Sequence, residues 1–266
     1  MIRIAVAGAV GRMGSRLIEI AHRDAEFDIV AALTLSSDPR LGKPAILDDP
    51  DLLLAANTDA DFDVLIDFSL PEGTMQWLPR CVESRSAMVT GTTGLSDAQQ
   101  AALRAAGRRI PVLWAPNFSI GINLLMRLAG SVARELGDDF NAEIVETHHN
   151  RKIDAPSGTA LSLAKAIAEA TGRDYESEVV HGRHGQAGPR PQHEIGIHAV
   201  RLGDEVGRHE IHFGGPGETL VLQHNVYSRD PFARGALLAA RWIVRQQPGF
   251  YSMQDVVTLA RSRQQG

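Results

Sequence analysis

The sequence predicts an α/β fold, with a Rossmann-like doubly wound parallel sheet plus a second α+β domain built on a mixed open sheet. Short apolar runs rich in β-formers alternate with helical patterns up to residue 115, as in parallel sheets covered by helices. A glycine turn at 8–14 follows the first run and precedes a helical pattern. Beyond residue 190, longer strand-like runs succeed one another without helices between them, which indicates a second sheet.

The first sheet is expected to contain strands at 2–7, 28–34, 63–68, 86–90 and 110–114. Helices are expected between them, at about 12–23, 49–56, 72–84 and 96–107. Parallel strands end at one edge of a sheet, and ligands bind in the crevice outside that edge. Residues 68–69, 91–93 and 115–118 each follow a strand, so we expect all three segments to line the crevice.

The pattern changes after residue 120. A long helix (about 120–136) leads to a strand (140–148), and a second helix follows Ser157. Residues 173–192 lack periodicity and predict a long loop. Strand-like runs at 193–202, 205–214 and 218–227 predict antiparallel pairing, and a last helix is expected over about 232–246.

The turn Gly8-Ala9-Val10-Gly11-Arg12-Met13-Gly14 has the position of a dinucleotide-binding loop, between a strand and a helix. Glycines permit a tight turn and let the backbone approach a pyrophosphate closely. The spacing is G-x-x-G-x-x-G rather than the strict G-x-G-x-x-G, and a glycine turn without a ligand is the alternative. Its place after the first strand of an alternating α/β chain favours a nucleotide cofactor.

Residues 146–160 carry the strongest signal for chemistry. His148, His149, Arg151 and Lys152 lie within five positions, and such a cluster is costly unless an anion neutralises it. Ser157 is a good N-cap, so the N–H groups of Gly158 and Thr159 should point out of a helix start that attracts anions. A solvated surface loop is the alternative for each residue alone. Together they indicate a small substrate with carboxylates.

Composition narrows the classes of function. The chain has 266 residues, a net charge of −5 and a pI near 6.1, which argue against general nucleic-acid binding. A single cysteine, Cys81, excludes an internal disulfide and a cysteine-rich zinc site. There is no apolar run of about 18 residues and no room for a signal peptide before the first strand. We therefore expect a cytoplasmic protein without nucleic-acid or membrane partners.

Together these motifs resemble one family closely, 4-hydroxy-tetrahydrodipicolinate reductase, also called dihydrodipicolinate reductase. The resemblance covers nearly the whole chain. It rests on the Gly8–Gly14 loop, Phe68 with Pro71-Glu-Gly-Thr74, Gly91-Thr-Thr-Gly94, Ala115-Pro-Asn-Phe-Ser119 and above all residues 146–160. It implies an oxidoreductase of lysine and diaminopimelate biosynthesis. Such an enzyme reduces 4-hydroxy-tetrahydrodipicolinate to tetrahydrodipicolinate with NADPH or NADH and loss of water.

The resemblance also implies a domain plan. The last segment returns to the first domain, so the dinucleotide-binding domain comprises 1–119 and 229–266, and residues 120–228 form a domain for substrate binding and oligomerisation, in a homotetramer. The segments after the strands then flank the nicotinamide of the cofactor. Their predicted contact residues are Phe68, Gly91, Thr92, Thr93, Ala115, Pro116, Asn117 and Phe118.

The resemblance also implies roles for the cationic segment 148–152 and for the helix start that follows it. His148 is the predicted proton donor, because imidazole can donate near neutral pH. Lys152 is cationic and can hold a carboxylate and stabilise negative charge that develops on the ring. His149 is predicted to contact substrate as a hydrogen-bond donor. Ser157, Gly158 and Thr159 would bind the second carboxylate at the helix start.

The preference between NADPH and NADH depends on the end of the second strand. An acidic residue there usually binds the ribose 2′-hydroxyl of NADH, but this chain has Thr34. Threonine does not repel a 2′-phosphate, and Arg12 or Arg40 could supply charge. Asp38 is a nearby acid. We therefore expect NADPH to be used at least as well as NADH.

Three alternatives stay open at this stage. A metal-dependent hydrolase or lyase would use His148 and His149, but Glu146 with His148 offers only a pair on one face, and metal sites need further ligands, so no metal is expected. A dinucleotide sensor could keep the fold without catalysis. A related reductase could act on another imine or semialdehyde, because spacing does not define the ring of the dicarboxylate.

Overall fold

The computed structural model describes residues 1–259 and divides the chain into two compact units. Unit 1 comprises Met1–Ile120 together with Arg229–Gly266, and unit 2 comprises Gly121–Ser228. The chain therefore leaves unit 1 once and returns to it. Among the described residues, no helix combines the length and apolar character that crossing a bilayer requires.

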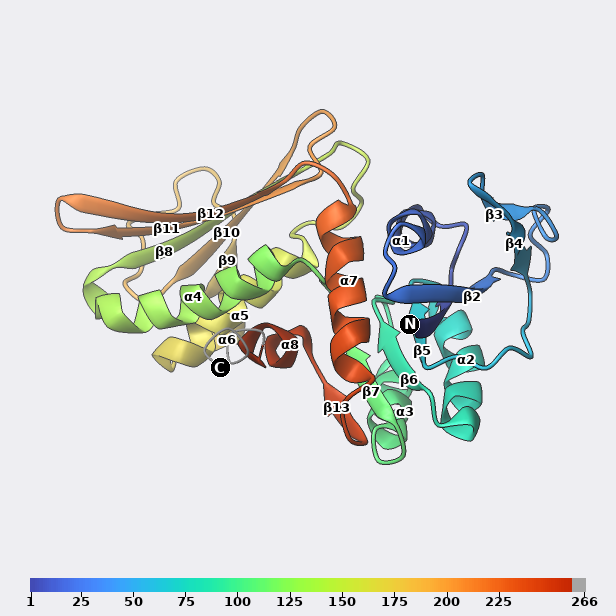
Figure 1. The fold of residues 1–266 in the computed structure, drawn as a ribbon. Coiled ribbons are helices and arrows are strands. Elements are labelled where there is room, and N and C mark those ends of the chain that lie inside the picture. Colours follow the sequence, from blue (N-terminus) through green and yellow to red (C-terminus); the bar gives the residue numbers. More distant parts are fainter. Residues whose placement is uncertain (260–266) are drawn as a thin grey trace. The chain divides into compact units, whose positions relative to one another are not determined.

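Unit 1 is built around an eight-stranded sheet in the order β13-β7-β6-β5-β1-β2-β4-β3. Every neighbouring pair in it is parallel except β3 with β4, which confirms the predicted Rossmann-like fold (Figure 1). Its strands are β1 (Ile2–Ala7), β2 (Phe27–Leu33), β3 (Pro44–Ile46), β4 (Asp49–Ala55), β5 (Val64–Asp67), β6 (Ala87–Thr90), β7 (Pro111–Trp114) and β13 (Gly249–Tyr251). Its helices are α1 (Arg12–His22), α2 (Pro71–Ser84), α3 (Asp97–Ala106), α7 (Asp230–Ile243) and α8 (Met253–Leu259).

Helices cover both faces of this sheet. Ile4 and Val6 of β1 pack in one core with α1, α7 and α8, whereas Ala5 and Ala7 pack in a second core with α2 and α3. Successive side chains of a strand point to opposite faces, and all four of these are buried. This double burial explains why the strand is a continuous apolar run rather than an alternating one.

The helix predicted at 49–56 is wrong. The segment forms β4, whose Leu54 pairs in parallel with Ala32 of β2. Leu52 and Leu54 are buried while Leu53 between them is 47% exposed. This period of two belongs to a strand, and three successive leucines concealed it in the sequence. The prediction also omitted β3, β13 and α8, each only three to seven residues long.

Unit 2 consists of a five-stranded sheet in the order β12-β11-β8-β10-β9 with helices on one face. Its elements are α4 (Ile120–Leu136), η1 (Gly137–Asp139), β8 (Asn141–His148), α5 (Gly158–Thr171), α6 (Tyr175–Glu178), β9 (Val179–His181), β10 (Ile195–Arg201), β11 (Gly207–Gly215) and β12 (Glu218–Val226). Figure 1 shows α4 and α5 together along that face. The core lies between these two helices and the sheet, and it includes Ile144 of β8, Ala129 of α4 and Leu163 of α5.

The pairing in this sheet is mixed, so the expected antiparallel succession is only partly right. β11 pairs antiparallel with β12 and with β8, but β10 pairs in parallel with β8 and β9. The predicted loop at 173–192 is also partly wrong, because it contains α6 and β9. The consequence for the site is that β8 lies at the centre of the sheet, where β10 and β11 place side chains on either side of it.

Candidate active site

The glycine turn of unit 1 is a tight, closely packed loop. Gly8 has φ +78°, a left-handed conformation that favours glycine, and a Cβ there would lie 2.5 Å from the carbonyl oxygen of Phe68. A Cβ on Gly14 would collide with the Gly8 carbonyl. Helix α1 starts at Arg12 with neither a capping side chain nor an acidic residue in its first turn. Its positive end is therefore available to a phosphate.

Two cavities open at the carboxyl edge of the parallel sheet, beside this turn. One, of 350 Å³, is lined by Gly11, Arg12, Met13, Phe68, Ser69, Leu70, Pro71, Gly91, Thr92, Thr93 and Arg229. The other, of 280 Å³, has Gly8, Val10, Gly11, Thr34, Asp38, Phe68 and Trp77 among its lining residues. The structure thus brings together most of the predicted cofactor residues within unit 1.

The remaining predicted cofactor residues lie at the same edge. Ala9 is buried within the turn, and 115–118 directly follow β7. The rings of Phe68 and Phe118 meet edge to face with centroids 5.4 Å apart. A side chain at Gly91 would collide with Phe68, so the segments after β5, β6 and β7 are in mutual contact.

Arg229 is a cofactor-side residue that no motif in the sequence marks. It lines the same cavity as Arg12. Burial, and then the charge of Arg12, lower the pKa of Arg229. Two guanidinium groups that repel each other at a helix N-terminus form a site suited to phosphate oxygens.

Asp67 is a second residue that sequence motifs do not reveal. Its side chain is fully buried at the end of β5 and accepts hydrogen bonds from Ser69 Oγ at 2.5 Å, Thr74 Oγ1 at 2.6 Å, Thr90 Oγ1 at 2.9 Å and Thr92 Oγ1 at 3.1 Å. One carboxylate therefore ties together the start of α2 and the segments after β5 and β6. It acts by fixing the shape of the crevice.

At the end of β2, Thr34 is part of a small ionic cluster. Thr34 Oγ1 donates to Asp38 Oδ2 at 3.2 Å, and Arg40 donates from Nε and Nη2 to the two oxygens of the same carboxylate. The hydrogen bond from Arg40 lowers the pKa of Asp38 well below its usual range. Asp38 is therefore an ionised acid in the cavity that holds Gly8 and Thr34, and Arg40 neutralises it.

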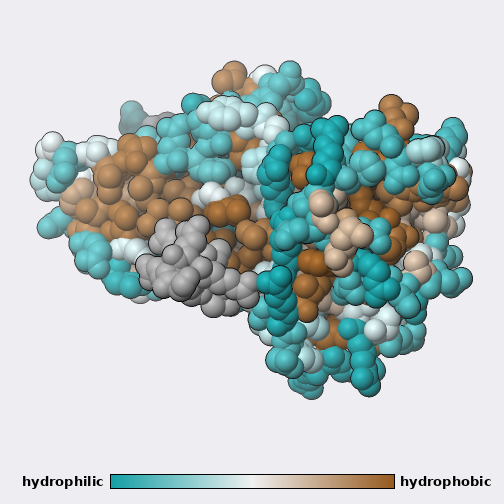
Figure 2. Space-filling view, viewed as in Figure 1, coloured by the Kyte–Doolittle hydropathy of each residue, from teal (hydrophilic) through white to brown (hydrophobic). Residues whose placement is uncertain are grey.

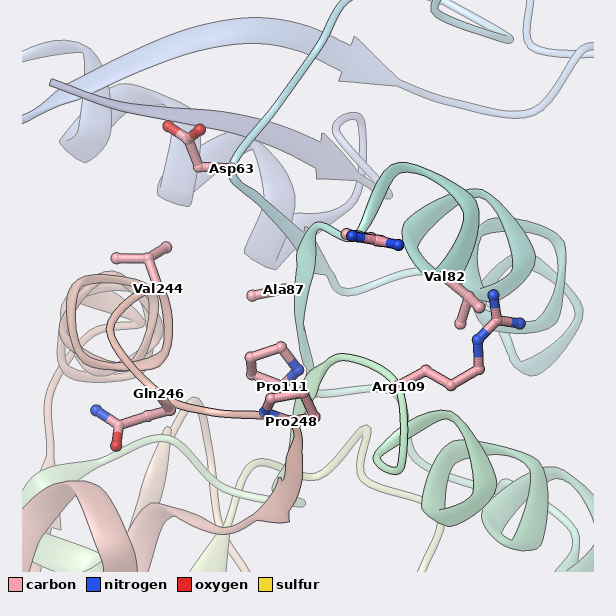
Figure 3. Close-up of a pocket in the computed structure, with 9 residues that line it drawn as sticks. Asp63, Val82, Ala87, Arg109, Pro111, Val244, Gln246 and Pro248 are labelled. Atoms are coloured by element: carbon pink, nitrogen blue, oxygen red, sulfur yellow. The ribbon is translucent and has the colours of Figure 1, made fainter.

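A further cavity, of 510 Å³, lies at the opposite edge of the sheet. Its lining includes Asp63, Ala87 and Pro111, which stand at or next to the starts of β5, β6 and β7. Figure 3 shows Pro111 and Pro248 together in its middle, with the Asp63 carboxylate directed away from them; that carboxylate accepts hydrogen bonds from Arg3. This edge lies away from the glycine turn, so the cavity plays no part in the cofactor site.

In unit 2, Glu146 organises the cationic segment. Residues 144, 146 and 148 of β8 share one face of the sheet, and Glu146 is fully buried. Its Oε2 lies 2.5 Å from His148 Nδ1. Arg201 of β10 donates to both carboxylate oxygens, at 3.0 and 2.9 Å, and the Ser157 N–H donates to Oε1 at 3.0 Å. One carboxylate therefore joins the proton-donor candidate to the start of α5.

The charge of this carboxylate is secured by its partners. Burial raises the pKa of Glu146, but the hydrogen bonds from His148 and Arg201 outweigh burial and lower the pKa to about 2. An ionised Glu146 favours a proton on His148 Nδ1, and Nε2 is the ring nitrogen that does not contact this carboxylate. Arg201 was not among the predicted residues, because it lies 55 positions away in the sequence and only the β8–β10 pairing brings it to Glu146.

The helix start has the predicted cap. Ser157 Oγ accepts from the Ala160 N–H at 3.2 Å, and α5 begins at Gly158. A Cβ on Gly158 would meet no atom within 4 Å, so open space adjoins the first N–H groups. This is the geometry that an incoming carboxylate requires.

The remaining residues of the cationic segment 148–152 differ in how far they are exposed. Lys152 Nζ lies 2.9 Å from Asp154 Oδ1, and the lysine side chain is 21% exposed. Arg151 pairs with Asp204 at 2.9 Å, and the two side chains are 70% and 86% exposed, so Arg151 belongs to the surface. His149 is half-buried. In the part of the chain that the structure describes, no three or more His, Cys, Asp or Glu side chains are grouped to hold a metal ion.

Comparisons with known proteins find one family along nearly the whole chain. The family model described as dihydrodipicolinate reductase, N-terminus, matches residues 2–118, and the one described as dihydrodipicolinate reductase, C-terminus, matches residues 121–257. The 4-hydroxy-tetrahydrodipicolinate reductase of Alkalilimnicola ehrlichii is 44% identical, with 97% of this chain and 99% of that protein covered. The enzyme of the same name from Syntrophotalea carbinolica is 42% identical, with 97% and 100% covered.

A solved structure is similar as well. The dipicolinate-bound dihydrodipicolinate reductase from Paenisporosarcina sp. TG-14 superposes with a TM-score of 0.72 at 26% identity. The match covers 96% of this chain and 99% of that one. The likeness therefore extends over both units.

Proposed function

Because this chain belongs to the dihydrodipicolinate reductase family, we propose that His148 and Lys152 carry out the proton and anion chemistry of its reaction. The enzyme reduces 4-hydroxy-tetrahydrodipicolinate to tetrahydrodipicolinate in lysine and diaminopimelate biosynthesis, with NADH or NADPH as cofactor. Water is lost, a hydride reaches carbon and a proton must be supplied. The roles of individual residues in these steps are the substance of the proposal.

The residues of unit 1 fit a dinucleotide. The cofactor, when bound, supplies the hydride. Gly8 and Gly14 let the turn pack tightly against the Phe68 carbonyl and against itself, and the N-terminus of α1 with Arg12 and Arg229 offers positive charge for the pyrophosphate. Thr34, Phe68, Gly91–Thr93 and Ala115–Phe118 complete the proposed contact set along the carboxyl edge of the sheet.

The proposed substrate site lies in unit 2. Lys152 binds one carboxylate as a cation that Asp154 holds in place, and the first N–H groups of α5, at Gly158 and Thr159, bind the other. His149 contributes a further hydrogen bond. The dipicolinate bound to the relative from Paenisporosarcina supports a small planar dicarboxylate for this site.

Proton delivery is proposed for His148. The donor is the imidazolium form, which carries protons on both ring nitrogens: Nε2 gives its proton to the reduced ring of the substrate, and the neutral ring that remains keeps its Nδ1 proton in the hydrogen bond to ionised Glu146. Lys152 stabilises negative charge that develops on that ring before the proton arrives. The single observation that carries the proposal is the 2.5 Å contact between Glu146 and His148, which orients the imidazole and binds the proton that stays on Nδ1 after Nε2 has donated.

The proposal extends to assembly and location. Leu220 and Val221 of β12 are 41% and 43% exposed, and Figure 2 shows hydrophobic side chains gathered over unit 2 along α4 and the strands beside it. Exposed apolar surface of this kind supports a homotetramer formed through the sheets of unit 2. A biosynthetic role favours the cytoplasm.

A coupled assay tests the proposal against its alternatives. Purified enzyme is mixed with the synthase that forms the substrate, and the absorbance of NADPH is followed with and without a chelator. We expect turnover that the chelator leaves unchanged. Turnover abolished by the chelator would favour a metal-dependent lyase, and NADPH binding without turnover would favour a dinucleotide sensor.

A further inference from the structure

His209 contacts His148, the proposed proton donor, and Ser157 at the start of α5, the proposed carboxylate site. It belongs to β11 and stands opposite Glu146 of β8 in the antiparallel register. Ile211 and Phe213, two and four residues further on, face the helix-covered core. Because side chains alternate along a strand, His209 faces the same side, and it is 4% exposed.

One atom of the ring contacts the helix start. His209 Nε2 lies 3.2 Å from Ser157 Oγ, in a hydrogen bond in which either atom can donate. The same hydroxyl accepts from Ala160 and caps α5. His209 therefore supports the residue that orients the first turn of the helix, while its own Nδ1 is buried and has no hydrogen-bond partner among residues 1–259.

The ring also contacts the proton-donor candidate. The imidazoles of His209 and His148 meet edge to face, with centroids 5.1 Å apart and planes at 76°. Two residues earlier on β11, a Cβ on Gly207 would lie 3.2 Å from His148 Nε2. This end of β11 thus bounds the imidazole of His148, while Glu146 holds it through Nδ1.

His209 does this without adding charge. Burial, followed by the positive charge of His148, lowers the pKa of His209 to about 3. A neutral ring can pack against a cationic segment without repelling it, and it does not compete with Lys152 for the substrate carboxylates. A permanent cation at this position would repel His148.

We propose that His209 is a positioning residue that couples the orientation of His148 to the anion-binding start of α5. The inference rests on the proposed function, because it assumes that His148 donates the proton and that α5 binds a carboxylate. Neither the motif 146–160 nor the spacing of the histidines points to it. The β8–β11 register alone brings His209 to that segment.

Two substitutions separate the two contacts. His209→Phe keeps a ring against His148 and loses the hydrogen bond to Ser157. His209→Gln keeps a group that can donate or accept near the position of Nε2 and loses the ring. His212→Phe and His212→Gln are the matched controls. His212 lies on the same strand and, three residues on, on the opposite face, where it bonds Glu210 at 3.0 Å.

The two His209 variants are expected to change different kinetic constants. His209→Phe should raise the substrate KM by about two- to tenfold, the value of one hydrogen bond, with little change in kcat. His209→Gln should lower kcat by about two- to tenfold, the value of one edge-to-face contact, with little change in KM. NADPH affinity, measured by fluorescence titration of the full chain, should be unchanged in both variants and in the controls.

Two results would overturn the inference: parent values of kcat and KM in both variants, or equal changes of kcat and KM in both, which indicate general packing. If a variant fails to fold, the parent protein still gives an answer. With ¹⁵N-labelled histidine, the His209 ring signal, distinguished from that of His224 by comparison with His224→Gln, should stay neutral from pH 8 to 5. It should shift when pyridine-2,6-dicarboxylate binds, and an unshifted signal would contradict the coupling. Parent turnover in His148→Gln would refute the proposed function instead.

Discussion

Glu146 Oε2 lies 2.5 Å from His148 Nδ1, and Arg201 binds the same carboxylate through two nitrogens. This arrangement fixes the direction of one imidazole and gives its Nδ1 a carboxylate acceptor. The carboxylate is buried, so these neighbours and the Ser157 N–H stabilise its charge in place of water. Most of the testable consequences concern what happens when one member of this group is removed.

Glu146→Gln should lower kcat by about 10- to 100-fold, a part of the 10²–10⁴ that a general acid contributes. The amide cannot hold the Nδ1 proton as an anion does, and it leaves Arg201 without a charge partner. Steady-state kinetics measure the effect. Glu143→Gln is the matched control, since Glu143 lies on the same strand and binds Arg183, Arg190 and His198 instead. Full kcat in Glu146→Gln would contradict the orienting role.

Lys152→Ala should lower kcat by about two orders of magnitude or more, because the negative charge that develops on the substrate loses its stabilising cation. Lys165→Ala serves as the control, since Lys165 is on the exposed side of α5.

Thr159→Val should mainly raise the substrate KM. In the presence of NADH, calorimetry should detect binding of pyridine-2,6-dicarboxylate to the parent and weaker binding to Lys152→Ala. A parent titration without heat would reject the two-anion site.

We expect cofactor choice to depend on the cluster of Thr34, Asp38 and Arg40. Because Arg40 neutralises Asp38, we expect NADPH to work at least as well as NADH. Arg40→Ala leaves an unpaired carboxylate facing the ribose, so it should lower kcat/KM for NADPH more than for NADH. Arg12→Ala should do the same by removing positive charge. Arg23→Ala, on an exposed arginine, is the control, and a tenfold preference of the parent for NADH would show that Asp38 acts as the usual ribose-binding acid.

The sequence predicted the fold where patterns are long and local. The glycine turn, the strands of the first sheet and the segment 146–160 are contiguous, so their positions could be assigned directly. The segment 49–56 was misassigned because Leu52, Leu53 and Leu54 conceal the alternation that pairing with β2 makes visible. Arg201, Arg229 and Asp67 were missed for a different reason. Each acquires its role from partners brought to it by strand order, and no local pattern encodes that order.

His209 should also make stability sensitive to acid. Its folded pKa of about 3 lies below the ordinary value of 6.5, first through burial and then through the charge of His148, with His224 and Lys152 acting in the same sense and Glu146 opposing them. The unfolded chain therefore binds more protons below pH 6.5. The stability is present in full above pH 6.5 and is lost as pH falls toward 3.

At pH 5 the loss amounts to about 2 kcal/mol. Glu146, whose pKa is about 2, stays ionised at pH 5. Burial also lowers the pKa of His224, so the contribution of His209 is the difference between the parent and a His209 variant over the range from pH 7 to 5. Thermal midpoints over this range should fall less in His209→Phe than in the parent or in His212→Phe. Equal slopes in the three proteins would show that His209 does not carry the pH dependence.

The measurement that tests the account most directly is the turnover of His148→Gln in the coupled assay, with binding measured alongside. We expect kcat to fall by about 10²–10⁴, while NADPH and pyridine-2,6-dicarboxylate bind as they do to the parent. His184→Gln, on an exposed histidine, should behave as the parent. Parent kcat in His148→Gln would contradict the assignment of His148 as proton donor.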